Sequence, residues 1–246
     1  MEGILRVLAD EEITKCRATR LTFFCVLVAI VILVAPLGSA APSGDEVAAK
    51  VTEKLREIQT VQAEVMAEIW DPSSKAPLKM TIRVTGDRAN QLTRMEVTQH
   101  PVFEGQIVIL DIRKDQTIVY MPVTAQAYRG RSAKVAAQLG VDLGTFDIDN
   151  LLSLDPSGVL SFRYVKQERL DRLPYHIVET RPKQGAGGSQ LVWVDAETYM
   201  VRKIEAFDDS GKKLALIMID GLKTNFKLDV NKLRELPRGT KITEVK

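Results

Sequence analysis

Apolar and polar side chains alternate in one stretch after another of this chain, beginning at residue 61. In VQAEVMAEIW, residues 61–70, every odd position up to Ile69 is apolar and most even positions are polar. In LKMTIRV, residues 78–84, the even positions are apolar. Successive side chains of a β-strand point to opposite faces of a sheet, so a period of two predicts a strand with one buried face.

The same alternation, interrupted by turn sequences, continues through most of the chain. It predicts further strands at residues 91–97, 105–112, 117–122, 161–170, 175–181, 189–195, 201–207 and 213–220. Short connections such as RKDQ and DRLP favour antiparallel neighbours. Strands in such number, each with one apolar face, must curl to bury that face. We therefore predict a half-open antiparallel β-barrel of about 10–11 strands.

Two parts of the chain have helical rather than strand periodicity. Ser43 followed by Glu46 is a capping-box pattern, and the apolar residues after it predict an amphipathic helix over residues 44–58. Residues 130–155 predict two more helices, SAKVAAQL and DIDNLLSL, with Asp147 as the cap of the second. We expect the helices to cover the open side of the sheet, which gives a mainly β fold with helices, of the α+β class.

The start of the chain differs from the rest. The basic segment RATR precedes an apolar run, residues 21–34, and small residues follow it, which is the order of a signal peptide. This run is shorter than the ~20 residues that span a bilayer as a helix, and an uncleaved anchor is the alternative. We predict a signal peptide at residues 1–40 and a single domain at residues 41–246. On either alternative the domain is exported, to the periplasm or the extracytoplasmic face of the membrane.

Few side chains in the predicted mature chain suit covalent or metal chemistry. Cys16 and Cys25 both precede the cleavage point, and the two histidines, His100 and His176, lie far apart in the sequence. Zinc sites need clustered His, Cys or carboxylate ligands, and no serine lies in a G-x-S-x-G motif. The 34 Lys and Arg residues nearly balance 32 Asp and Glu residues and form no block. We predict neither enzyme activity, nor a cofactor, nor a metal, nor a nucleic-acid partner.

The triplet Asp209-Ser210-Gly211 has two interpretations. It matches the motif of aspartic proteases, but that chemistry needs a second carboxylate that shares the proton. A hairpin loop between two alternating strands also favours Asp, Ser and Gly, because these residues suit the backbone of a turn. We predict a turn.

Three segments carry a resemblance to a known family. They are LVWVDAETYMVRKIEAFDDSG at 191–211, IMIDGLKTNFKLDVNKLRELPRGTKI at 217–242 and DIRKDQTIVYMP at 111–122. Together with the signal-peptide pattern, the first helix and the meander, they resemble the periplasmic outer-membrane lipoprotein carrier family, the LolA-like lipoprotein-sorting proteins. In the second segment the resemblance implies a strand, a short helix and a last strand after a Pro-x-Gly turn.

The resemblance implies a half-open barrel with a helix lid and an apolar cavity that shields the acyl chains of its cargo. It implies a monomeric carrier, or chaperone, that binds a lipidated protein or an envelope lipid and exchanges it with a membrane-bound donor or acceptor complex. Family members hold the lid through an arginine near the early strands, and Arg88 and Arg94 are the candidates here. The alternative is an envelope-stress sensor of the same fold, of the type that binds an anti-sigma factor.

The expected cavity lining is drawn from apolar positions of the first helix, the early strands, the second predicted lid helix and a late strand. The candidates are Val47, Val51, Leu55, Met80, Ile82, Met95, Val97, Ile107, Ile109, Leu151, Leu152 and Trp193. For each of these residues the alternative role is ordinary packing in the protein core.

Overall fold

The computed structural model describes residues 41–70, 76–139, 154, 158–184 and 187–245. Contacts divide the chain into residues 1–41 and residues 42–246, and the second of these units is described below. The predicted signal segment and most of the predicted helix at 147–154, with Leu151 and Leu152, lie outside the described residues. Among the helices that are described, none is both long enough and apolar enough to cross a membrane.

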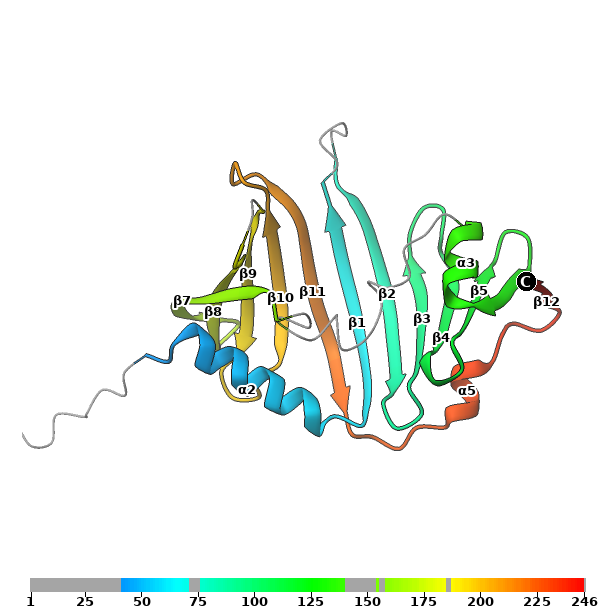
Figure 1. Cartoon of the computed structure of the whole chain (residues 1–246), viewed down its shortest axis with the longest axis horizontal. Helices are drawn as coiled ribbons and strands as arrows, with labels where there is room; N and C mark the ends of the chain where they lie inside the picture. The colour runs from blue at the N-terminus through cyan, green and yellow to red at the C-terminus, as the bar shows by residue number, and fades with distance from the viewer. Residues whose placement is uncertain (1–40, 71–75, 140–153, 155–157, 185–186, 246) are drawn as a thin grey trace, which may run out of the picture. The chain divides into compact units, whose positions relative to one another are not determined.

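The described strands form one twelve-stranded sheet (Figure 1). The strands are β1 (Thr60–Ile69), β2 (Leu78–Asp87), β3 (Leu92–Gln99), β4 (Ile107–Asp111), β5 (Gln116–Met121), β6 (Gln126–Arg131), β7 (Leu160–Leu170), β8 (Leu173–Pro182), β9 (Ser189–Asp195), β10 (Val201–Phe207), β11 (Lys213–Thr224) and β12 (Lys241–Val245). Their order in the sheet is β12-β6-β5-β4-β3-β2-β1-β11-β10-β9-β8-β7. The first and last strands of this order do not pair with each other, so the sheet is open. This confirms the predicted half-open, mainly antiparallel architecture.

Two details differ from the prediction. The strand β6 was not expected, because AQAYRGR is polar and glycine-containing and lacks the alternation that marks its neighbours. The last strand, β12, pairs with β6 in parallel, whereas all other neighbours are antiparallel. With these two strands the sheet has twelve strands rather than about 10–11.

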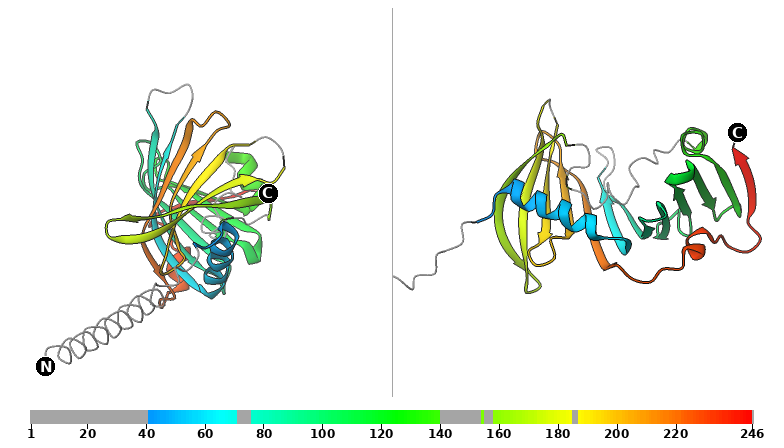
Figure 2. Two further views of the ribbon diagram at one scale, coloured as in Figure 1. Left: turned by 90° about the vertical axis from the view of Figure 1, so that its left-hand side faces the viewer. Right: turned by 60° about the horizontal axis from the view of Figure 1, so that its bottom comes forward.

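Helix α2 (Gly44–Glu57) begins at the predicted capping box. The Ser43 hydroxyl accepts the Glu46 N–H at 3.1 Å, and the Glu46 carboxylate accepts the Ser43 N–H at 2.7 Å. The helix packs against β7 and β8 on one face of the sheet, here called the inner face (Figures 1 and 2). A Cβ atom on Gly44 would lie 2.7 Å from the backbone carbonyl of Phe162, so the close approach to β7 requires glycine.

Helix α3 (Ser132–Leu139) is the predicted SAKVAAQL helix, and it covers the inner face near β5, β6 and β12. Its Val135 is fully buried and packs in one cluster with Val119. Helix α5 (Val230–Arg234) packs against β2 and β3 on the opposite, outer face, where Leu233 is buried on Leu92 and Ile109. The sheet around β3 to β5 is therefore covered on both faces. A 3-10 helix, η1 (Ile112–Lys114), joins β4 to β5.

Candidate functional site

A cavity of about 340 Å³ lies on the inner face between β2–β5 and α3. Its lining consists of Met80, Ile82, Met95, Val97, His100, Phe103, Gln106, Val108, Val119, Met121 and Leu139. All of these side chains except His100 and Gln106 are apolar. Its volume is at the lower end of the ~300–1,000 Å³ typical of pockets for small ligands.

Strand register explains why these residues meet. Ile82 pairs with Val97, Met95 pairs with Val108, and Val108 pairs with Val119. Residues that pair directly across antiparallel strands point to the same face of the sheet. The apolar positions of four consecutive strands thereby form one continuous apolar wall, and Leu139 at the end of α3 adds to it.

The two polar groups of the cavity both come from the connection between β3 and β4. His100 is only 8% exposed and its ring stacks on Phe103, with the centroids 4.7 Å apart. Its Nδ1 atom accepts the backbone N–H groups of Val102 and Phe103, each at 3.0 Å. Its Nε2 atom is buried and has no hydrogen-bond partner within the part of the chain that the structure describes.

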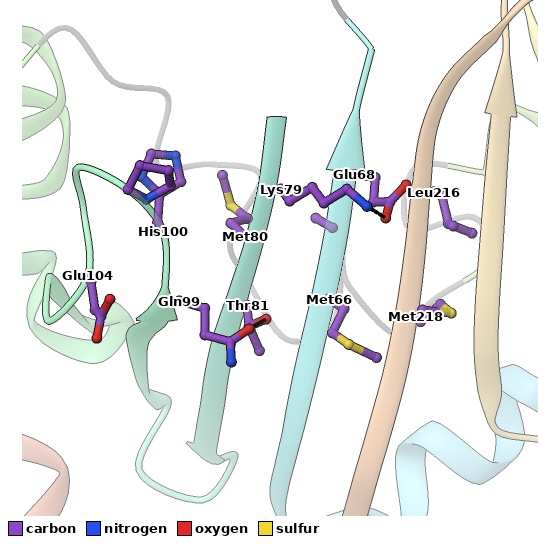
Figure 3. A pocket seen from close by; sticks show the side chains of 12 residues that line it. Met66, Glu68, Lys79, Met80, Thr81, Gln99, His100, Glu104, Leu216 and Met218 are labelled. Atoms are coloured by element: carbon purple, nitrogen blue, oxygen red, sulfur yellow. Dashed lines mark hydrogen bonds and ion pairs between the residues drawn. The ribbon is translucent and has the colours of Figure 1, made fainter. Parts of the chain in front are cut away.

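A second, more polar pocket of about 370 Å³ lies beside β1, β2 and β11 (Figure 3). Lys79 and Glu68 form an ion pair at 2.6 Å in its wall, and Met66 pairs across the strands with Met218. His100 also lines this pocket, so its imidazole lies between the two spaces. The salt bridge and the mixed lining make this pocket a poorer site for an apolar ligand than the inner cavity.

Four of the predicted lining residues meet in the inner cavity, namely Met80, Ile82, Met95 and Val97. Leu151 and Leu152 lie outside the described residues. Seven further side chains of the lining were not predicted: His100, Phe103, Gln106, Val108, Val119, Met121 and Leu139. The sequence does not mark the facing of Val119, because Ile118, Val119 and Tyr120 are apolar in succession. The position of the β3–β4 connection depends on tertiary structure.

The other predicted lining residues do not line this cavity. Val47, Val51 and Leu55 pack in the core cluster between α2 and the late strands. Ile107 and Ile109 point to the outer face, where α5 covers them.

Trp193 also lies on the outer face. It pairs with Ile177 and alternates with Val192 and Val194, which point into the α2 core. The Lys203 ammonium lies 4.0 Å from the centroid of its ring, which is cation–π geometry.

The two arginine candidates occupy opposite faces. The Arg88 guanidinium donates a hydrogen bond to the carbonyl of Leu55 in the last turn of α2. The Arg94 guanidinium donates to the Glu235 carbonyl at 2.6 Å, directly after α5. Only Arg88 is therefore in contact with a helix of the inner face.

The remaining candidate chemistry has structural explanations. In the Asp208–Lys212 turn, the Asp208 carboxylate accepts the N–H groups of Ser210 and Lys212, both at 2.9 Å. Gly211 has φ of +81°, as such a turn requires. The triplet that begins at Asp209 is thus a hairpin turn, as predicted.

The second histidine, His176, lies at the α2 end of the inner face. It packs between Tyr164 and Tyr199, with ring centroids 5.9 and 5.8 Å away. Burial and the nearby charge of Lys50 hold the pKa of His176 below its ordinary value. The neutral imidazole is therefore the form that the folded protein favours.

Comparison of the fold with solved structures finds several similar proteins. An uncharacterized conserved protein from Thermus thermophilus is 15% identical, with 81% of this chain and 98% of that chain covered and a TM-score of 0.55. MucB in complex with MucA(peri) is 14% identical, with 81% of this chain covered and a TM-score of 0.51. This chain spans 62% of the MucB chain. A LolA superfamily protein from Nitrosomonas europaea is 14% identical, with 77% and 96% covered and a TM-score of 0.37.

No protein-family model matches the sequence, and a search of the curated proteins finds no match. At identities this low, likeness to a solved structure shows the fold alone. Within that limit, the open twelve-stranded sheet with helices on its inner face confirms the predicted architecture. In fold, this chain is similar to the uncharacterized Thermus thermophilus protein and to MucB.

Proposed function

We propose that this protein is an exported carrier that binds a lipid or a lipidated protein and shields its acyl chains from water, without covalent chemistry. The observation that supports this proposal most strongly is the inner cavity, with nearly all of its lining apolar in a LolA-like fold. Lining of this kind offers dispersion contacts to an alkyl chain and offers few hydrogen-bonding groups to water.

The energetic gain from such a cavity is large enough to matter. Each CH₂ group removed from water contributes ~0.8 kcal/mol. Enclosure of about five CH₂ groups would then contribute ~4 kcal/mol, which corresponds to about a thousandfold in Kd. A carrier needs moderate affinity of this kind because it must also release its cargo.

Helix α2 is the proposed movable element, and Arg88 is the proposed gating residue. Its guanidinium holds the last turn of α2 through the Leu55 carbonyl. Asn225 also holds this end, because its side chain donates to the Glu57 carbonyl at 3.2 Å and accepts the Gln59 N–H at 2.7 Å. Breakage of the Arg88 contact would loosen the end of the helix without disruption of the sheet hydrogen bonds. The cost would be about 1–2 kcal/mol, near the lower end of the range for a hydrogen bond with a charged group.

We further propose that residues 1–40 direct export and that the mature protein works in the periplasm or at the extracytoplasmic face of the membrane. A membrane-bound donor or acceptor complex would load or unload it. An envelope-stress sensor of the same fold is the alternative, and it predicts stable binding of a protein partner in the absence of lipid.

A cavity-filling substitution tests the carrier proposal. Val97→Phe places a ring in the cavity without the addition of charge, and Val165→Phe makes the same change on β7, away from the cavity lining. Binding of a fluorescent palmitate analogue is measured by titration, with circular dichroism as the check on folding.

We expect the Val97→Phe variant to bind the analogue about tenfold more weakly than the parent protein. Loss of room for about two CH₂ groups, at ~0.8 kcal/mol each, gives this factor. The Val165→Phe variant should bind like the parent. No binding by the parent protein, or equal weakening in both variants, would contradict a carrier role for this cavity.

A further inference from the structure

We propose that His100 anchors the ligand by donation of a hydrogen bond from Nε2 to the carbonyl oxygen of an acyl group. This inference rests on the proposed function and adds to it the part of the ligand that the protein recognises. The ligand class is then an alkyl chain that ends in an ester or amide, rather than any apolar molecule of suitable size.

The hydrogen bonds of Nδ1 determine which nitrogen of His100 carries the proton. Two backbone N–H groups, of Val102 and Phe103, point at Nδ1 at 3.0 Å. An acceptor of N–H groups must present a lone pair, so the proton of the neutral imidazole lies on Nε2. The unpartnered atom is therefore a hydrogen-bond donor, and its complement is an oxygen acceptor.

Burial makes this donor costly to leave unpaired. His100 is more than nine-tenths buried, and Nε2 has no partner within the described residues. A buried polar group without a partner loses hydration without compensation, and native proteins seldom leave one in that state. Stacking on Phe103 and the two N–H contacts fix the orientation of the ring, so Nε2 cannot turn away.

The distribution of polarity in the cavity agrees with an amphiphilic ligand. Both polar side chains of the lining, His100 and Gln106, come from the β3–β4 connection, and β2, β3, β4, β5 and α3 contribute apolar side chains only. An acyl chain with its carbonyl near His100 and its alkyl part against the strands would satisfy both regions. A plain hydrocarbon would leave the Nε2 proton unpaired.

The test uses two probes of nearly equal length and shape. Methyl octanoate carries a carbonyl acceptor, and undecane carries none. Each probe competes with the fluorescent palmitate analogue on the full-length exported protein and on the variant His100→Asn. Asparagine suits this position because its side-chain oxygen accepts N–H groups two and three residues on, as Nδ1 does here. Its amide nitrogen then takes the place of Cδ2 and does not reach the position of Nε2.

We expect the ratio of methyl octanoate affinity to undecane affinity to be about tenfold higher in the parent protein than in His100→Asn, and this difference is the preference that the Nε2 hydrogen bond supplies. The variant His100→Phe keeps the ring stack and should lose the preference as well. Its loop N–H groups are unpaired, so thermal melting is measured alongside. Loss of preference in both variants excludes an effect of loop distortion alone.

Other outcomes separate failure of this inference from failure of the proposed function. If the affinity ratio of the two probes is the same in the parent protein and in His100→Asn, the anchor is wrong and the apolar carrier stands. If neither probe binds the parent protein, both proposals fail.

A last comparison identifies the source of the acyl group. An ester-linked phospholipid and its ether-linked analogue compete with the palmitate analogue, and so does a synthetic lipopeptide with ester-linked and amide-linked chains. Stronger competition by the ester phospholipid than by its ether analogue indicates an envelope lipid as cargo. Competition by the lipopeptide alone indicates a lipidated protein. No advantage of the ester over the ether form, together with no competition by the lipopeptide, would overturn the anchor.

Discussion

Asp111 is a buried carboxylate at the end of β4, and it fixes α5 to the outer face of the sheet. Its Oδ2 atom lies 2.7 Å from Nη2 of Arg234 in α5, and its Oδ1 accepts the N–H of Lys114 at 3.2 Å. Burial by itself raises the pKa of Asp111, but the hydrogen bonds from Arg234 and Lys114 outweigh it, so the pKa lies below its ordinary value. The ionised form is the one that stabilises the fold.

Arg234→Met should lower the free energy of unfolding at pH 7 by about 1–2 kcal/mol, because Asp111 stays buried without its guanidinium partner. The loss stays at this low level because Arg234 is 38% exposed and solvent screens its charge. A carboxyl group whose pKa is lowered by folding stabilises the fold at pH values above its ordinary pKa of ~3.9. This stabilisation is lost as the pH falls through the pKa that the group has in the folded protein.

Urea unfolding at pH 7 and at pH 3 checks this prediction. The difference between parent and variant should be smaller at pH 3. The exposed Arg238 provides the control, since Arg238→Met should leave stability unchanged at either pH. A loss of the same size at both pH values would mean that Arg234 acts by packing rather than by charge.

His176 gives a second residue-scale prediction, which concerns a basic side chain rather than an acidic one. Its pKa is lowered in the folded state by burial and by the charge of Lys50, so the unfolded chain binds its proton at a higher pH than the folded protein does. Stability that involves this histidine is therefore lost as the pH falls below the ordinary value of ~6.5. Protonation would place a charge between Tyr164 and Tyr199.

His176→Phe should remove that part of the pH dependence and keep the aromatic packing. Thermal melts of the parent protein between pH 7.5 and pH 5 should show a fall in Tm that is smaller in the variant. An unchanged slope in His176→Phe would contradict the assignment.

The residues found by sequence reasoning were those whose strands alternate cleanly. In β2 and β3 the polar positions Arg83 and Glu96 mark the outer face, so Ile82 and Met95 were correctly assigned to the inner face. No such marker exists for His100. A single histidine beside a proline gives no sign that the fold will bury it, and only the tertiary structure reveals its unpaired nitrogen.

At the scale of elements, the inward face of β4 could not be predicted, for a physical reason. Residues 107–110, IVIL, are apolar at every position because α3 lies near the inner face of this region and α5 covers its outer face. With no polar residue to mark the solvent side, the sequence leaves two choices of face. In the structure Ile107 and Ile109 point to the outer face. Val108 is the residue that lines the cavity.

The same ambiguity affects β9, where residues 191–194 read LVWV. The strands whose facing was predicted correctly were those exposed on one side. Strand β6 could not be predicted for a different reason: its sequence lacks apolar alternation, and the strand is stabilised by pairing with β5 and β12. Strand existence was thus predictable from periodicity, and strand facing was predictable only where one face stays polar.

Helix α2 supplies the element-scale prediction. If the Arg88 hydrogen bond to the Leu55 carbonyl holds the last turn of α2, Arg88→Met should lower the protection of α2 amides from hydrogen exchange by about 5- to 30-fold. This factor corresponds to about 1–2 kcal/mol. Arg94→Met is the matched control, because Arg94 contacts the segment after α5 and not α2.

Hydrogen exchange with mass spectrometry resolves the two helices in one experiment. The Arg88 variant should exchange faster in residues 50–58 and the Arg94 variant faster near residues 230–236. Unchanged exchange of α2 in the Arg88 variant would remove Arg88 from any gating role.

At the scale of the whole molecule, the proposed function depends on an open sheet with an apolar cavity between strands β2–β5 and α3. The sheet is open because its two edge strands, β12 and β7, do not pair with each other. Helices α2 and α3 cover part of its inner face. The cavity lies where the covering side chains of α3 and the β3–β4 connection leave space against the strands. The fold positions the cavity, and its apolar lining is what makes an acyl ligand the best chemical match.

The most direct measurement examines what the protein carries when it leaves an exporting host. The exported protein is purified without detergent and its mass is measured under native conditions, and bound material is then extracted into organic solvent and identified. The carrier function predicts acylated protein or phospholipid in near-stoichiometric amount, and a reduced amount in the Ile82→Asp variant, which places a charge in the cavity wall but should keep the circular dichroism spectrum. A folded parent protein that carries no acyl compound, and takes up none when it is incubated with phospholipid vesicles or lipopeptide, would contradict the carrier function.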